Sequence, residues 1–74
     1  MTPKTITEFS VVGSGIDEHN PDYDTSRDFF NELSFAQRKK VQFFKKVWEF
    51  DKRSGEYNEK EVILISSYQG NKIL

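Results

Sequence analysis

The sequence predicts a small single domain of the α+β class, in which a helix covers one face of a two- or three-stranded sheet. Segments 5–12 and 62–68 are rich in β-branched residues, which favour strands. The long segment between them, 25–52, has the apolar period of an amphipathic helix. The 74 residues include no cysteine, so the core has to be built from apolar packing, for which seven Phe, three Tyr and one Trp are available.

Residues 5–12 are expected to form the first strand, although their alternation of apolar and polar types is imperfect. Gly13-Ser14-Gly15 is expected to end this strand in a turn. Residues 13–24 as a whole are interpreted as a polar, acidic loop. A loop of this length is long for a small domain, and such loops are often functional.

Segment 25–52 is predicted to be helical because its apolar side chains fall on one half of a helical wheel. The sequence Thr25-x-x-Asp28 resembles an N-terminal capping box. The apolar stripe contains Phe29, Leu33, Ala36, Val41, Phe43, Phe44, Val47 and Trp48. Phe44 and Trp48 lie near the middle of this stripe, and we expect them at the centre of the core.

The length of this segment leaves two alternatives open. One helix over 25–52 would be about 40 Å long at 1.5 Å per residue. A strand of six or seven residues covers only about 20 Å. Either the helix breaks at Ser34, where Ser34-x-x-Gln37 forms a second capping-box pattern, or a partner or a second copy of the chain covers the excess stripe.

The C-terminal part is expected to hold the second strand. Arg53-Ser54-Gly55 has the composition of a helix end, and segment 62–68 reads as a mostly buried strand because four apolar residues are consecutive. The order of the strands stays open. A parallel pair of 5–12 and 62–68 would make the helix a right-handed crossover, whereas Ile73 and Leu74 could instead pair back in antiparallel fashion.

Charge is distributed unevenly along the chain. Residues 35–53 contain seven basic and two acidic residues, a net of +5, and residues 1–34 contain two basic and seven acidic residues, a net of −5. On a helix the basic residues would form two parallel rows: Arg38, Lys45 and Lys52, and Lys39, Lys46 and Arg53. These rows are either a solvated surface or a docking face, and Phe35 beside them is a candidate interface anchor.

The acidic loop offers an alternative docking surface, formed by Asp17, Glu18, Asp22 and Asp24. Its spacing departs from a calcium-binding loop at the essential glycine and glutamate positions, so no metal site is expected. Gly13-x-Gly15 lacks the third glycine of a dinucleotide fingerprint. His19 has no nucleophilic partner at a recognisable spacing. No catalytic residue and no cofactor is therefore expected, and the chain is interpreted as a protein other than an enzyme.

Protein binding is the function that these features favour. Small autonomous modulators, such as virus-encoded inhibitors of host machinery, share the small size and charge polarity. The alternative is nucleic-acid binding through the basic face of segment 38–53, against which stands an isoelectric point of 5.8. A homodimer is a further expectation. The N-terminus has no apolar signal-peptide region and no segment is long enough to span a bilayer, so a cytoplasmic protein without a membrane partner is expected.

Overall fold

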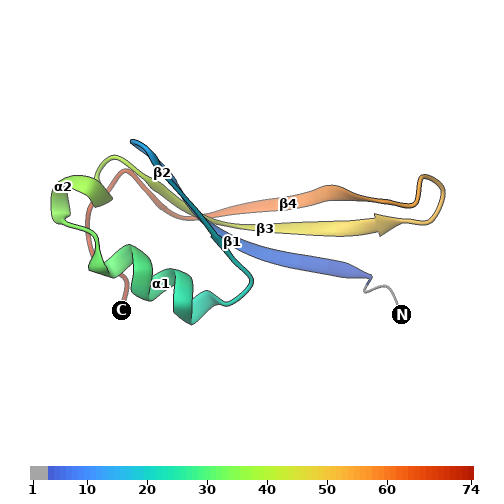
Figure 1. The fold of residues 1–74 in the computed structure, drawn as a ribbon, viewed down its shortest axis with the longest axis horizontal. Helices are drawn as coiled ribbons and strands as arrows, with labels where there is room; N and C mark the ends of the chain where they lie inside the picture. Colours follow the sequence, from blue (N-terminus) through green and yellow to red (C-terminus); the bar gives the residue numbers. More distant parts are fainter. Residues whose placement is uncertain (1–3) are drawn as a thin grey trace.

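A computed structural model describes residues 4–74, which form one four-stranded antiparallel sheet with two short helices at one end (Figure 1). The elements are β1 (Thr5–Gly13), β2 (Ile16–Asn20), α1 (Tyr23–Glu32), α2 (Phe35–Arg38), β3 (Gln42–Asp51) and β4 (Glu56–Ser67). The strand order is β2-β1-β3-β4. A small domain of mixed helix and strand is therefore confirmed, but it has more strand than predicted. The expectation that the N-terminus has no signal peptide concerns a segment whose first residues, 1–3, lie outside the described residues.

The first half of the sheet is a tight hairpin. Gly13 pairs with Ile16, so only Ser14 and Gly15 connect β1 to β2, and both have positive φ, at 47° and 82°. This is the geometry of a type I′ turn, whose twist matches that of paired strands. The predicted strand and turn are confirmed. The prediction of a long acidic loop over 13–24 is wrong, because residues 16–20 form β2 and α1 begins at Tyr23.

The predicted break at Ser34 is confirmed. Ser34 Oγ accepts a hydrogen bond from the Gln37 amide at 3.2 Å, and Gln37 Oε1 accepts one from the Ser34 amide at 3.0 Å. These reciprocal bonds form a capping box that starts α2. The cap of α1 is Asp22, not Thr25, because Asp22 accepts the hydrogen bond from the Thr25 amide.

The helix predicted over 25–52 is wrong after Arg38, since residues 42–51 are the central strand β3. Both faces of β3 carry apolar residues, and this hides the two-residue period of a strand. Phe43 lies on one face and is fully buried, whereas Phe44 and Trp48 lie on the other and are only half-buried. The expectation that Phe44 and Trp48 form the centre of the core is therefore wrong as well.

The C-terminal part also differs from expectation. Arg53, Ser54 and Gly55 belong to the turn between β3 and β4, and β4 starts at Glu56, six residues before the predicted strand. β4 pairs with β3 and not with β1, so the strands of residues 4–74 contain no parallel crossover. The last residues do not form a strand. The side-chain amide of Asn31 binds both the carbonyl (2.7 Å) and the amide (2.8 Å) of Ile73, which holds the tail against α1.

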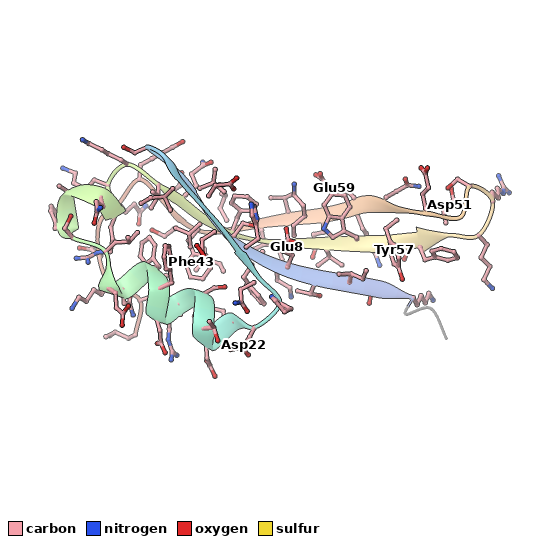
Figure 2. All side chains as sticks on the ribbon, in the orientation of Figure 1. Glu8, Asp22, Phe43, Asp51, Tyr57 and Glu59 are labelled. Carbon is pink, nitrogen blue, oxygen red and sulfur yellow. The ribbon has the colours of Figure 1, made fainter. Side chains whose placement is uncertain are left out.

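The core lies at one end of an elongated molecule measuring 44 × 19 × 18 Å. Its four fully buried apolar residues are Val11, Phe30, Val41 and Phe43. Phe43 points from the sheet toward α1, where its ring centroid lies 5.5 Å from that of Phe30 (Figure 2). The two helices do not extend along the β3–β4 hairpin (Figure 1). The far half of the sheet therefore has no helical cover.

Candidate functional site: the open face of the sheet

Arg38, the first residue of the predicted basic rows, is buried inside the helical end. Its Nε donates to the carbonyl of Gly70 at 2.6 Å, and its Nη1 donates to the carbonyls of Leu33 and Asn31. Only 7% of the residue is exposed. The guanidinium therefore links the end of α1, α2 and the C-terminal segment, and it is not available to a partner.

The remaining basic candidates do not form rows. Lys45 and Lys46 are consecutive in β3, so their side chains point to opposite faces of the sheet. Lys52 and Arg53 lie in the hairpin turn at the far end of the molecule. Lys39 stays beside Phe35, with its Nζ 5.6 Å from the centroid of the exposed ring, and the buried Arg38 lies beside the same ring with its Cζ at 6.0 Å. The helical surface on which the nucleic-acid alternative depended is absent.

The acidic candidates are similarly divided. Asp22 caps α1, and Asp24 in its first turn lies 3.5 Å from the Arg27 guanidinium. Asp17 and Glu18 are in β2. The pKa of Asp22 is lowered, first by the hydrogen bond from the Thr25 hydroxyl and then by that from the Thr25 amide. Asp22 thus acts as the N-terminal cap of helix α1.

One face of the sheet gathers apolar side chains that the sequence did not single out as a surface. The strand registers place Ile6 opposite Trp48, Phe44 opposite Leu64, and Lys46 opposite Val62. These side chains share the face opposite to Phe43 and α1, because neighbouring positions alternate between faces. We call this the open face and define it by Ile6, Phe44, Trp48, Val62 and Leu64. Ile6, Val62 and Leu64 are 41%, 46% and 55% exposed.

Lys46 lies in the middle of the open face. Its Nζ is 5.8 Å from the ring centroid of Phe44 and 5.2 Å from that of Trp48, and it forms an ion pair with Glu59 at 3.5 Å. The ammonium group is thus held over two aromatic faces while an acidic side chain neutralises it. As a result, the centre of the open face is aromatic, and the charge of Lys46 is balanced by Glu59.

A polar cluster borders the open face on β1 and β2. Ser10 lies opposite His19 in the hairpin, and Ser10 Oγ is 2.7 Å from His19 Nδ1. The same nitrogen is 3.4 Å from Glu8, and His19 Nε2 is 2.5 Å from Asp17. The hairpin register creates this cluster. The sequence could have revealed it only if residues 16–20 had been recognised as a strand paired with β1.

The Ser10–His19–Asp17 contacts follow the order of a nucleophilic triad, but in a working triad the serine hydroxyl has to be accessible to the substrate. Ser10 is 1% exposed, so no substrate can approach its hydroxyl in this geometry. The contacts satisfy the polar groups of the hairpin and leave carboxylates of Glu8 and Asp17 on the surface. They act here as an acidic border to the open face.

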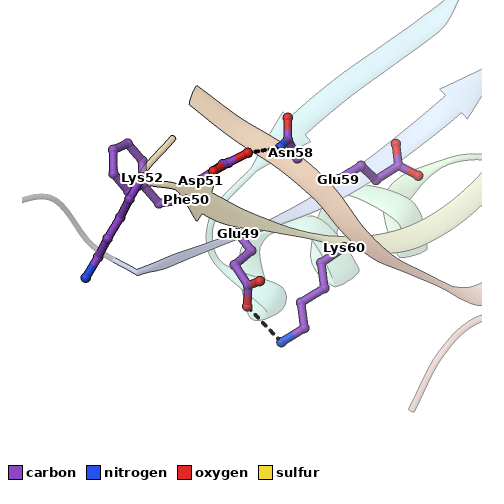
Figure 3. A pocket seen from close by; sticks show the side chains of 7 residues that line it. All are labelled: Glu49, Phe50, Asp51, Lys52, Asn58, Glu59 and Lys60. Atoms are coloured by element: carbon purple, nitrogen blue, oxygen red, sulfur yellow. Dashed lines mark hydrogen bonds and ion pairs between the residues drawn. The ribbon is translucent and has the colours of Figure 1, made fainter. Parts of the chain in front are cut away.

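A hollow with a volume of about 400 Å³ lies at the far end of the hairpin (Figure 3). It is lined by Glu49, Phe50, Asp51, Lys52, Asn58, Glu59 and Lys60. Glu49 pairs with Lys60 at 3.3 Å, and Asp51 accepts hydrogen bonds from the Arg53 amide and from Asn58. These polar groups stabilise the hairpin end, and they do not converge on a common point.

Within residues 4–74, no group of three or more His, Asp or Glu side chains is placed to hold a metal ion. No helix in the same part of the chain has the length and apolarity required to cross a membrane. Comparisons with protein-family models, with curated proteins and with solved structures gave no match. The open face is therefore the feature of this chain that best indicates a function.

Proposed function

We propose that this chain is a small non-enzymatic module that binds another protein through its open face and so acts as a modulator or inhibitor. The observation that carries this proposal is the exposure of Ile6, Val62 and Leu64 next to half-buried aromatic rings. A small domain rarely leaves adjoining apolar side chains of three strands in water unless a binding partner covers them. Aromatic residues are also enriched among the residues that dominate binding energy.

The charges around the open face indicate the chemistry of the partner. Glu8 and Asp17 border it on one side, and Glu59 lies beside Lys46 on the other. A partner with an apolar patch and basic residues at its margin complements this surface. The acidic border repels phosphate groups, so it favours a protein over a nucleic acid. The cytoplasmic setting expected from the sequence is part of this proposal.

Ile6→Glu tests the proposal directly. Ile6 lies on β1, and a charge there disrupts the open face without touching the buried core. The matched control is Phe35→Glu, because Phe35 is a similarly exposed apolar residue at 55% but lies on α2. Each chain is immobilised and exposed to extract of its native cell or host, and the captured proteins are identified by mass spectrometry.

We expect wild type and Phe35→Glu to capture the same partner, and Ile6→Glu to lose it while keeping its thermal midpoint. Purified partner should then bind wild type with an association rate that falls as salt rises, because the acidic border steers the encounter. Loss of capture only in Phe35→Glu would move the interface to α2 and overturn the proposal. Equal capture by all three chains would overturn it too.

A further inference from the structure

Along residues 62–64, strand β4 has an edge that no other described strand pairs with, and it is apolar on both faces. It is the last strand in the order β2-β1-β3-β4, so only β3 binds its backbone within the described chain. Val62, Ile63 and Leu64 are 46%, 43% and 55% exposed, and they alternate between the two faces of the sheet. Proteins usually protect such edges, because exposed backbone groups beside apolar side chains recruit another strand.

The part of β4 that can accept a strand is well defined. The pairing with β3 is interrupted at two places, where Lys60 and Ile65 each have no partner of their own. These β-bulges twist the strand and disturb its edge. Between them, residues 61–64 pair regularly with β3. The other edge of the sheet, β2, has only five residues, and its sequence Ile-Asp-Glu-His-Asn is mostly polar.

We propose that the edge of β4 pairs with β4 of a second copy of this chain, antiparallel, with Ile63 opposite Ile63. In this register Val62 lies opposite Leu64 on the open face, and Ile63 meets its counterpart on the other face. A shift by two residues in either direction places Val62 opposite Ser66, or Leu64 opposite Lys60. The proposed register is therefore the one in which the three exposed apolar residues pair only with each other.

Charge also favours a second copy as the occupant. In the proposed register Lys60 lies opposite Ser66 and Glu61 opposite Ile65, so no like charges face each other across the junction. The net charge of the chain is only −1, which leaves little repulsion between two copies. Because the β2 edge is short and polar, the pairing ends with two chains and does not propagate into a fibre.

The dimer would extend the open face. A two-fold axis perpendicular to the sheet keeps the open faces of both copies on the same side of one eight-stranded sheet. Pairing at the β4 edge does not cover Ile6, Phe44 or Trp48. The inference is independent of the partner proposed above, and each can fail without the other.

Single cysteines test the register, because the chain has none of its own. In Ile63→Cys the two new thiols face each other, with Cα atoms about 4.5–5.5 Å apart, which suits a disulfide. In the control Glu61→Cys the two positions are four residues apart along the strands, about 13 Å. We expect Ile63→Cys to form a disulfide-linked dimer about tenfold faster or more under mild oxidation, since paired strands give a millimolar effective concentration. Equal rates, or faster linkage of Glu61→Cys, would overturn the register.

Ile63→Glu tests the dimer itself. In the monomer the new carboxylate lies opposite Lys45 on β3, a favourable cross-strand pair, but in the dimer two carboxylates meet. By sedimentation at high micromolar concentration we expect wild type to be a dimer and Ile63→Glu a folded monomer. An equimolar mixture of Ile63→Glu and Ile63→Lys should restore a mixed dimer. A monomeric wild type overturns the inference, as does a mixture that stays monomeric.

The two proposals are separated by crossing the variants. Ile63→Glu removes the dimer but leaves the open face, so capture of the protein partner should persist. Ile6→Glu removes partner capture but should sediment as wild type does. If Ile63→Glu abolishes both dimerisation and capture while its thermal midpoint is unchanged, the β4 edge is the surface for the other protein, and the second copy is rejected as its natural occupant.

Discussion

Arg38 connects three segments of the chain through one guanidinium group. It binds carbonyl oxygens of Asn31 and Leu33 at the end of α1 and of Gly70 in the C-terminal segment. A carbonyl oxygen that is buried without a donor is costly, because water cannot replace the lost bond. Arg38 therefore fixes the path of the chain at the helical end, and its charged guanidinium strengthens these hydrogen bonds.

Replacing Arg38 should therefore destabilise the protein much more than replacing its neighbour. We expect Arg38→Met to lower the free energy of unfolding by about 2–3 kcal/mol, since charged hydrogen bonds are lost and their acceptors stay buried. Lys39→Met is the control, because Lys39 is exposed and contacts only the ring of Phe35 among the interactions described. Urea unfolding of both variants measures the difference. Equal stability of the two would contradict the role assigned to Arg38.

Gly13 is constrained by space and by backbone conformation. Its φ is +143°, and a Cβ there would lie 2.3 Å from the carbonyl oxygen of Lys40. Gly15, in the same hairpin, has φ +82° but no atom within 4 Å of a Cβ. We expect Gly13→Ala to cost about 3 kcal/mol, from clash and strain together, and Gly15→Ala about 1 kcal/mol from strain alone. Thermal unfolding of the pair checks this order.

At the scale of the elements, the sheet is attached to α1 mainly by aromatic contacts. The ring of Tyr23 lies 5.4 Å from that of Phe9, and Phe30 packs on Phe43 at 5.5 Å. Phe9 and Phe43 lie on the covered face of the sheet, and Tyr23 and Phe30 pack on them from α1. Phe44 and the other β3 side chains on the open face do not contact α1 in this way.

Phe43 and its neighbour Phe44 should consequently respond very differently to truncation. Phe43 is completely buried, and we expect Phe43→Ala to cost about 3–5 kcal/mol, enough to unfold a domain of this size. Phe44→Ala should cost only about 1 kcal/mol, because that ring is half exposed on the open face. Circular dichroism melts of the two variants decide the matter. An unfolded Phe44→Ala beside a folded Phe43→Ala would reverse the faces assigned to β3.

The cap of α1 should make stability fall in acid. Hydrogen bonds from Thr25 lower the pKa of Asp22 below its ordinary value of 3.8, so the folded state favours the carboxylate. This contribution is complete above pH 3.8 and is lost as the pH falls through the lowered pKa. Asp22→Asn keeps a capping side chain that does not titrate. Its stability relative to wild type, from urea unfolding at several pH values, should improve in acid. A difference that does not change with pH would contradict this.

The local signals in the sequence predicted the turn at Gly13–Gly15 and the capping box at Ser34, but they placed the cap of α1 at Thr25 instead of Asp22. Gly13–Gly15 and Ser34-x-x-Gln37 each require a particular backbone conformation. Gly55 also has positive φ, but its turn joins two strands instead of ending a helix. The assignment of β3 failed because Val41, Phe43, Phe44, Val47 and Trp48 fit a helical wheel as well as a strand with two apolar faces. Their β-branched and aromatic character favoured the strand. The open face could not be predicted, because it depends on strand registers.

At the scale of the whole molecule, the helices cover the sheet at only one end of the 44 Å axis (Figure 1). The helices and the buried core occupy one end, and β1, β3 and β4 extend beyond them as a narrow ribbon (Figures 1 and 2). Beyond Glu49, where the pairing with β1 ends, only β3 and β4 remain, and a pair of strands with few buried side chains has little to resist local opening. The Phe50–Tyr57 contact, with ring centroids 5.3 Å apart, and the Glu49–Lys60 ion pair stabilise this end.

Hydrogen exchange should reveal this gradient. Among amides that are hydrogen-bonded to a neighbouring strand, we expect those of residues 41–44 and 64–67 to exchange only by global unfolding, and those of 48–51 and 56–59 to exchange through local opening at lower free energy. Nuclear magnetic resonance exchange rates at increasing urea concentration separate the two classes, because only global unfolding exposes enough surface to respond strongly. Uniform urea dependence along β3 and β4 would show instead that the hairpin unfolds with the core.

The C-terminal segment has a consequence for how the chain folds as it is made. Asn31 reaches Ile73 across 42 positions, and Arg38 reaches Gly70 across 32. The ribosome releases residues in order, so α1 and α2 emerge long before the backbone groups that fix them. β1 and β2 can form their hairpin early, but the helical end cannot close until residue 73 has left the exit tunnel. Until then the nascent chain would carry an unfinished core, and the native state would form only after the contacts of Gly70 and Ile73 are delivered.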